Sequence, residues 1–326
     1  MNKSVIKALK VIFPLLIGFS ILIWLYRDFD FSRAGDVFVN QMNPWWMLLS
    51  LVFGVTGHVF RGWRWRLTLS PLGYYPDRAL CVHAILLSYG TNLVVPRLGE
   101  VSRCTVLDRE AKVPFSTSLG TVVSERVVDM LSSLVFVFLS MLTQWALLER
   151  VVEIDTSKLE NWQSVLHDVP LYGILSVILI LVWIGVMVIR RLRLHTRVKR
   201  IVMDLWSGIQ SIRQVKYPGL YVLLTAGIWL SYFLHFYLAF YSFPFTAHLG
   251  IGAGLLGFVL GSFAILVPTP NGAGPWHAAV IAGLMIYGVS QNDAADFAFI
   301  VHAIQTFLVA LLSLISMVYL SFYSKK

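Results

Sequence analysis

The chain has 326 residues, of which 57% are hydrophobic and only 13% are charged, and its mean hydropathy is +0.73. A soluble domain carries about 25% charged residues, so this chain cannot cover a water-exposed surface of its size. Composition therefore excludes a soluble cytosolic enzyme, a disordered chain and a nucleic-acid-binding protein. It predicts an all-α, polytopic helical membrane protein that forms a single integral membrane domain over residues 1–326.

Basic residues dominate the charge, with 26 lysines and arginines against 17 acidic residues and a net charge of +9. Most stand at the ends of apolar runs, where they set the topology and contact anionic lipid head groups. The two cysteines, Cys81 and Cys104, have no metal-ligand spacing, and the chain has no phosphate-cradling loop or nucleophile elbow. We therefore predict no catalytic residues, no metal, no cofactor and no nucleic-acid partner.

The first apolar run covers residues 11–26 and follows three lysines within the first ten residues. Arg27 and Asp28 come directly after it, where a signal peptide would need small residues for cleavage. We therefore predict an uncleaved first span with the N-terminus in the cytoplasm.

A second span is predicted over residues 45–60, and it ends in the run Arg61-Gly62-Trp63-Arg64-Trp65-Arg66. Tryptophans gather at the membrane interface and arginines on its cytoplasmic side, so this run is typical of an interfacial belt. Direct binding of lipid phosphate by the arginines is the alternative interpretation.

Residues 79–95 are apolar but are interrupted near their end by short polar residues and a glycine. Both flanks, 61–78 and 103–112, carry the basic residues of a cytoplasmic segment, so a single crossing would place one flank on the wrong side. We predict a re-entrant hairpin over residues 79–103 with its turn near residues 90–92. Broken backbone at membrane depth requires protein or a wet cavity to satisfy it.

The middle of the chain predicts two spans, over residues 124–148 and 171–189, joined by the acidic segment 149–168 outside the cytoplasm. A dense cluster of arginines and lysines follows at residues 190–200 and marks the cytoplasmic side. Residues 198–215 place apolar side chains at helical spacing. This pattern predicts either an amphipathic helix on the inner leaflet or a solvated helix packed on the bundle.

Two further spans are predicted over residues 220–243 and 298–323, with the C-terminal lysines in the cytoplasm. No lysine or arginine occurs over residues 245–292, where a loop rich in proline and glycine divides two apolar stretches. We predict a second re-entrant hairpin over residues 250–289, entered from outside. The total is six crossings, or up to eight if the hairpins cross fully, and discontinuous helices of this kind mark the binding sites of secondary transporters.

The first of three polar clusters lies at the end of the first hairpin. On a helix, Arg97, Glu100 and Arg103 would share one face and form ion pairs, because a charge in hydrocarbon costs at least about 2.5 kcal/mol without a partner. Both a structural ion pair that holds the hairpin and an arginine-lined site for a lipid phosphate fit this pattern. The cluster comprises Asn92, Pro96, Arg97, Gly99, Glu100 and Arg103.

The second cluster opens the span over residues 124–148 with Glu125, Arg126 and Asp129. The two carboxylates lie one helical turn apart, and Arg126 can reach Asp129. We expect these side chains to face the bundle interior and to pair with an arginine of the first cluster. A cytoplasmic boundary is the alternative interpretation of part of the cluster.

The third cluster is the loop over residues 268–277. Gly272 and Gly274 permit left-handed backbone and close approach, and Pro275 suits the first turn of the next helix. The N–H groups of such a helix start can bind an anion. His277 can bind phosphate, carry a proton or serve as a hydrogen-bonded structural residue. The binding candidates here are Asn271, Gly272, Gly274 and His277.

Together, the three clusters resemble the transmembrane region of the lysylphosphatidylglycerol synthetase family of flippase-like membrane proteins. The family pattern has an Asn, then Pro-x-Arg-x-Gly-Glu-x-x-Arg, then Glu-Arg-x-x-Asp at a helix start, then a Pro-x-Pro-Gly-Gly-x-Gly loop ending in Glu. Here Arg97 directly follows Pro96, Asn271 replaces a glycine, and His277 stands where many members have the Glu. These departures bear on the identity of the substrate.

The resemblance implies lipid translocation without lipid synthesis, because we expect no soluble aminoacyl-transfer domain. We predict a lipid flippase, not an enzyme, which moves a phospholipid or lipid-linked intermediate across a bacterial inner membrane through a polar intramembrane cavity. The arginines of the first two clusters would attract the phosphate, and the carboxylates would balance them or bind a cationic head group. The alternatives are an integral membrane enzyme that acts on a lipid phosphate, with His277 as acid or base, and a non-transporting scaffold for envelope assembly.

Overall fold

The computed structural model describes Gly18, residues 20–27 and 29–143, Met203, Trp206 and residues 210–323. These residues form helices joined by turns and loops, with no strand among them. Residues 20–26 are helical, as predicted for the end of the first span. The predicted span over residues 171–189 lies outside the described residues, as do parts of those predicted over 11–26, 124–148 and 198–215.

Three helical segments are long and apolar enough to cross a membrane: Phe115–Thr143, Pro218–Ser242 and Gln291–Tyr323. They are helix α6, helix α11 (Pro218–Tyr237) with the 3-10 turn η4 (Leu238–Ser242) after it, and helix α14. Each overlaps a span predicted from the sequence, but α6 begins at Phe115 rather than near residue 124, so Glu125 and Asp129 lie inside the helix and do not open it. The prediction of an all-α membrane fold is therefore confirmed in its class, while the total of six to eight crossings stays a prediction.

Helix α3 (Pro44–Leu69) differs most from its predicted bounds. It begins as expected, because Pro44 suits a first helical position and the Asn43 side chain accepts a hydrogen bond from the Trp45 backbone N–H at 3.0 Å. However, it continues past residue 60 and carries Arg61 and Arg64 into the protein interior, where they are 5% and 0% exposed. The interpretation of these two arginines as a cytoplasmic belt was wrong.

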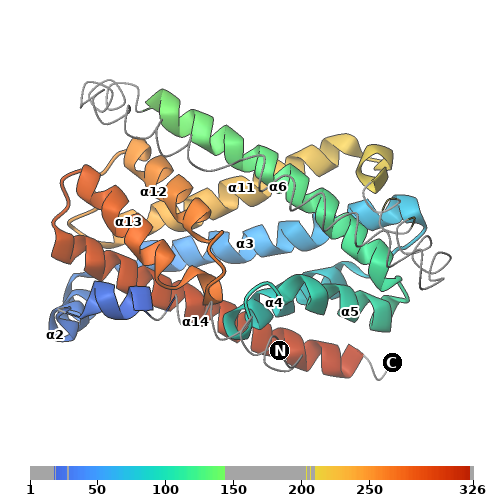
Figure 1. Cartoon of the computed structure of the whole chain (residues 1–326), viewed down its shortest axis with the longest axis horizontal. Coiled ribbons are helices and arrows are strands. Elements are labelled where there is room, and N and C mark those ends of the chain that lie inside the picture. The colour runs from blue at the N-terminus through green and yellow to red at the C-terminus, as the bar shows by residue number, and fades with distance from the viewer. Residues whose placement is uncertain are drawn as a thin grey trace, which may run out of the picture.

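Both predicted hairpin segments fold into adjacent helix pairs. The first pair is α4 (Arg78–Val94) with α5 (Gly99–Ala111), and the second is α12 (Ile251–Ala264) with α13 (Pro275–Ile286). Figure 1 shows the two pairs pointing in opposite directions, with their tips facing each other near the middle of the molecule. The re-entrant path of either pair through the membrane stays a prediction.

The turn of the first pair was predicted near residues 90–92, which is too early in the sequence. Helix α4 runs unbroken through residues 90–92, and the tip lies between Val94 and Gly99. Gly90 serves packing instead, because a Cβ atom there would overlap the side chain of Ser313 on α14. The polar interruption in the sequence therefore marks a close helix contact rather than a turn.

The long helices hold the two hairpins together. Helix α14 has 33 residues, runs along one edge of the molecule in Figure 1 and packs against both α4 and α13. Helix α11 packs along α3. At its start, α14 is tied to the short helix α2 (Phe31–Asp36) by ion pairs from Arg33 to Asp293 and Asp296.

Two apolar cores lie at opposite ends of this frame. One is built on aromatic side chains of α11, α12, α13 and α14, including Phe236, Phe258, Trp276 and Phe297. The other joins α3, α4 and α5 around Trp65. In contrast, α6 exposes large apolar side chains such as Met130 (58%) and Phe138 (59%), the surface expected to face lipid tails.

Candidate functional site

A cluster of five buried charges, which we call the charge core, lies where α3, α5 and α6 meet. Its members are Arg61, Arg64, Arg103, Glu125 and Asp129. Arg103 Nη1 donates to Glu125 Oε2 at 2.9 Å, and Arg64 Nη2 donates to Asp129 Oδ1 at 2.8 Å. Arg61 pairs with the other oxygen of Asp129. Asp129 therefore accepts from two arginines at once.

Helical spacing builds this cluster. Arg61 and Arg64 lie three residues apart on α3, and Glu125 and Asp129 lie four apart on α6, so each pair shares one helix face. The predicted burial of the two carboxylates is confirmed, with Glu125 0% and Asp129 8% exposed. The predicted pairing between the first and second clusters is also confirmed, through Arg103.

The charge core is not neutral. Three guanidinium groups face two carboxylates, which leaves one positive charge in excess. Arg64 Nε, Arg103 Nε and Arg103 Nη2 are buried without a hydrogen-bond partner among the described residues. The Arg103 guanidinium lies 4.8 Å from the centre of the Trp65 ring, and that cation–π contact offsets part of its desolvation. Glu125 Oε1 likewise has no hydrogen-bond partner among these residues, although Arg64 Nε lies 3.8 Å from it.

A second, exposed ion pair extends the charge core to the surface. Arg126 Nε donates to Glu100 Oε1 at 2.6 Å, and Arg126 Nη1 lies 3.6 Å from Asp129 Oδ2. The side chains of Arg126 and Glu100 are 51% and 37% exposed. The reach of Arg126 to Asp129 was predicted correctly. The predicted pairing of Glu100 with Arg97 or Arg103 was wrong.

Arg97 does not share a helix face with Glu100, because it lies in the tip of the first hairpin rather than on α5, which begins at Gly99. Arg103 is on α5 but pairs with Glu125 instead. Its backbone is left-handed, with φ of 67°, and its Nη2 donates to the carbonyl oxygen of Leu266 at 3.0 Å. Arg97 thus connects the two hairpin tips. Asn92 closes the same tip, because its Oδ1 accepts from the Gly99 backbone N–H at 2.8 Å.

The tip of the second hairpin follows the sequence-based expectation closely. Asn271, Gly272 and Gly274 all have positive φ, of 49°, 75° and 91°, and Pro275 begins α13. The Asn271 side chain donates to Thr306 Oγ1 at 2.8 Å. The Gly274 backbone N–H donates to His277 Nδ1 at 3.3 Å, so His277 caps the start of its own helix.

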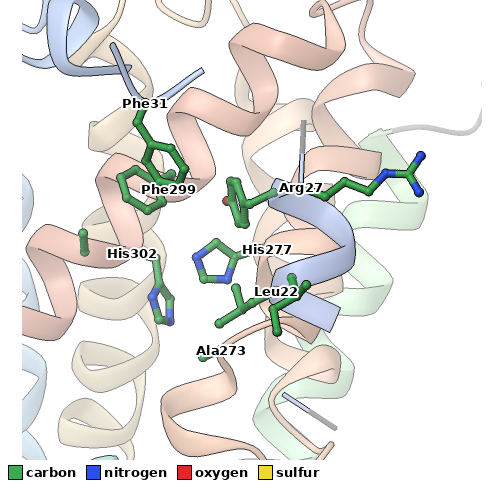
Figure 2. Close-up of a pocket in the computed structure, with 10 residues that line it drawn as sticks. Leu22, Arg27, Phe31, Ala273, His277, Phe299 and His302 are labelled. Carbon is green, nitrogen blue, oxygen red and sulfur yellow. The ribbon is translucent and has the colours of Figure 1, made fainter. Parts of the chain in front are cut away.

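Beside this tip lies a cavity of about 540 Å³. His277 is 4% exposed, and its ring centre lies 4.4 Å from that of His302. Figure 2 shows the two imidazoles near the Phe299 ring, while the Arg27 guanidinium points away from them. The rest of the wall is mostly apolar. The lining residues are Leu22, Ile23, Tyr26, Arg27, Phe31, Ala273, His277, Phe299, His302 and Ala303.

The predicted site residues therefore fall into three places rather than one. Five of them form or adjoin the charge core, two build the first tip, and four lie in the second tip beside the cavity. Sequence reasoning missed Arg61 and Arg64, although their spacing of three within a glycine- and tryptophan-containing helix indicates one shared face. In the described part of the chain, no group of three histidine, cysteine or acidic side chains is placed to hold a metal ion.

Comparison with known proteins identifies the family. The family model described as "Lysylphosphatidylglycerol synthase TM region" matches residues 11–313. Searches of curated proteins and of solved structures found no match. The match covers most of the chain, including the charge core, both hairpin tips and the cavity. The chain is therefore a multi-pass membrane protein that belongs to the lysylphosphatidylglycerol synthase transmembrane-region family.

Proposed function

We propose that this protein moves a phospholipid or lipid-linked intermediate from one membrane leaflet to the other. The polar head group passes along the surface that carries Arg97, Glu100 and Arg126, while the acyl chains stay in the bilayer. The observation that carries the proposal is this exposed set of charges, in which Arg97 links the two hairpin tips and the Glu100–Arg126 pair is continuous with the buried charge core.

The surroundings of these charges support a path at membrane depth. Arg126 lies on α6 about 17 Å beyond Phe115, at 1.5 Å per residue, and so is far from the helix start. Its exposed neighbours are apolar, including Val127 (50%) and Met130 (58%). A charge on an apolar surface of this kind needs a polar partner, and a passing head group is such a partner.

The chemistry favours a phosphate. A guanidinium fork binds two phosphate oxygens at once, whereas an ammonium binds as a point charge. Four arginines, at positions 61, 64, 103 and 126, form ion pairs with three carboxylates, at positions 100, 125 and 129, so the connected set has one positive charge in excess. A phosphodiester with one negative charge reduces this excess.

The cavity beside His277 lies at the second hairpin tip, to which Arg97 is hydrogen-bonded through Leu266. Its aliphatic and aromatic wall suits the glycerol and first acyl carbons of a lipid. We propose a bacterial inner membrane as the location, with both termini in the cytoplasm, from the distribution of lysine and arginine along the chain.

Reconstitution tests the proposal. The full chain is placed in liposomes that contain fluorescent phospholipids with anionic, zwitterionic or cationic head groups, and the label in the outer leaflet is quenched chemically. We expect exchange between leaflets well above that of protein-free vesicles for at least one head group. Arg126→Gln should slow it. Arg109→Gln is the matched control, because that side chain is 74% exposed beside Glu110 on α5. No exchange for any head group would refute the proposal.

A membrane enzyme that acts on a lipid phosphate is the second candidate, and the paired imidazoles of His277 and His302 in the cavity favour it. Head-group or phosphate release by the purified protein, lost in His277→Gln, would support the enzyme. We propose that no bond is cleaved, since no serine, threonine, cysteine, lysine or carboxylate side chain lines the described cavity wall. A scaffold differs from both, because it predicts that neutralised charges weaken the fold without changing any lipid movement.

A further inference from the structure

A chain of polar side chains leads from the charge core into the apolar bundle, and the proposed head-group path does not use it. Arg61 Nη1 donates to Tyr89 Oη at 3.3 Å. The Tyr89 and Tyr232 hydroxyls are hydrogen-bonded at 3.1 Å, and Tyr232 Oη lies 3.3 Å from His58 Nδ1. The chain crosses from α3 to α4 and α11 and returns to α3. It ends at an imidazole, a side chain that can hold or release a proton.

His58 lies near the middle of α3 and is 8% exposed. The groups that face it are Arg61 on its own helix, Tyr89 on α4, and Tyr232 and His235 on α11. On α6, Asp129 reaches it only through Arg61. Within the described part of the chain, no carboxylate forms an ion pair with this imidazole. A proton on His58 would therefore add positive charge beside a core that already has one arginine in excess.

An anion changes this balance. When a phosphate enters beside the arginines, the excess charge of the core is cancelled and a proton on His58 becomes easier to hold. The effect is reciprocal by linkage, because a protonated His58 must favour the anion as much as the anion favours the proton. Arg61 of the charge core and His58 belong to one hydrogen-bonded series, so binding of an anion at the arginines and binding of a proton at His58 cannot be independent.

We propose that each anionic lipid head group is carried together with a proton held on His58, so that lipid movement is proton-coupled. This rests on the proposed lipid transport. It adds the coupling ion, and it requires a net-neutral complex of one phosphodiester and one proton. A neutral complex crosses an apolar bundle more easily than a charged one.

The hydrogen-bond chain supplies the link between the two sites. With His58 neutral, Nδ1 accepts from the Tyr232 hydroxyl, and Tyr89 accepts from Arg61. When a proton from water enters at Tyr89, the two hydroxyls relay it to Nδ1, the ring nitrogen that is free to accept it; Nδ1–H then donates to Tyr232, and the Tyr232 hydroxyl turns toward Tyr89. The Tyr89 hydroxyl proton then points away from Tyr232, toward the charge core. Release of the proton to water on the other side reverses the chain.

The test uses two measurements on the full chain. In proteoliposomes with fluorescent phosphatidylglycerol, leaflet exchange is followed at equal pH and then with a gradient of one pH unit. We expect a steady-state ratio of labelled lipid between leaflets of about tenfold, with accumulation on the alkaline side, because one pH unit corresponds to a factor of ten for one coupled proton. In weakly buffered detergent, addition of phosphatidylglycerol should cause uptake of about one proton per bound lipid.

Variants separate the possible results. His58→Gln should slow exchange at equal pH, because the anionic head group then crosses without its proton, and it should abolish both the gradient response and the proton uptake. Tyr232→Phe should weaken both responses. His248→Gln is the control, because His248 is exposed and is not a member of the hydrogen-bonded series from Arg61 to His58. If the wild-type protein exchanges lipid but the steady-state ratio between leaflets does not change with the pH gradient, the coupling is refuted and the lipid transport is not. A His58→Gln variant with a normal gradient response would also overturn the coupling. If the wild-type protein shows no exchange at equal pH, the lipid transport on which the coupling rests is itself refuted.

Discussion

Arg103 on α5 and Glu125 on α6 form an ion pair at 2.9 Å in which both side chains are almost completely buried. The pair joins the first hairpin to a helix that crosses the membrane, and Arg64 on α3 approaches the same carboxylate at 3.8 Å. Three helices therefore meet at Glu125. Because buried charges are costly when their partners are lost, this meeting point should control the stability of the bundle.

Removal of the Glu125 charge should destabilise the protein strongly. Glu125→Gln leaves three buried arginines with one carboxylate, and loss of one partner of a buried pair costs about 3–5 kcal/mol. Chemical unfolding in detergent, followed by circular dichroism, measures the change. The control is Glu100→Gln, whose side chain is 37% exposed and whose loss should cost less than about 1 kcal/mol. The interpretation fails if the two variants are equally stable.

Helices α3 and α4 should separate when Gly62 acquires a side chain. A Cβ atom at Gly62 would lie 2.7 Å from Val82 Cα, which is backbone that cannot move aside cheaply. Gly62→Ala should therefore cost about 1–3 kcal/mol by overpacking, as measured by the melting temperature in detergent. Gly219→Ala provides the comparison, because a Cβ atom there meets nothing within 4 Å. That variant should be as stable as the wild type or slightly more stable.

Arg97→Gly should lower the rate of lipid exchange without lowering the stability of the protein. Glycine adopts a left-handed backbone without strain, whereas the φ of 67° is unfavourable for arginine. The variant should therefore fold at least as well as the wild type. It nevertheless lacks the guanidinium that reaches Leu266 and, as proposed, the head group. We expect lipid exchange to fall about tenfold, equivalent to about 1.4 kcal/mol. Unchanged exchange would show that Arg97 only positions the tips.

The two hairpins point in opposite directions, so the helix ends that lie away from their tips should be exposed on opposite sides of the membrane. Tyr75 precedes α4 and is 69% exposed, while Ile286 ends α13 and is 57% exposed. Single cysteines at these positions, in a background with Cys81 and Cys104 replaced, should react with an impermeant maleimide from opposite sides. Labelling of intact and inverted vesicles measures this. Reaction of both positions from the same side would contradict the opposed arrangement.

The helices and the inward-facing carboxylates were predictable because each has a local cause. An apolar run of sufficient length predicts a span, and two carboxylates one turn apart at the start of such a run must find interior partners. Glu125 and Asp129 followed this logic. The second hairpin tip was predictable for a similar reason, since Pro275 and two glycines strongly restrict the local backbone.

The buried arginines and the first tip were not predictable in this way. Arg61 and Arg64 stand in a run that has the same local composition as an interfacial belt, and only the arrival of Asp129 from α6 gives them a buried role. Likewise, Gly90 is suitable for a turn as well as for close packing. The deciding contact, with Ser313, comes from a residue more than 200 positions away. Long-range partners settled both cases.

Helix α14 limits how the two hairpins can move. As a single continuous helix of 33 residues that touches both α4 and α13, it acts as a rigid strut between them and fixes their spacing. Sliding of one hairpin along the other would require the strut to break. Pivoting about it would not, so alternating exposure of the proposed path is easiest at the tips, where the described links to release are the hydrogen bond from Arg97 to Leu266 and the contact of α4 with the turn Pro270–Gly272.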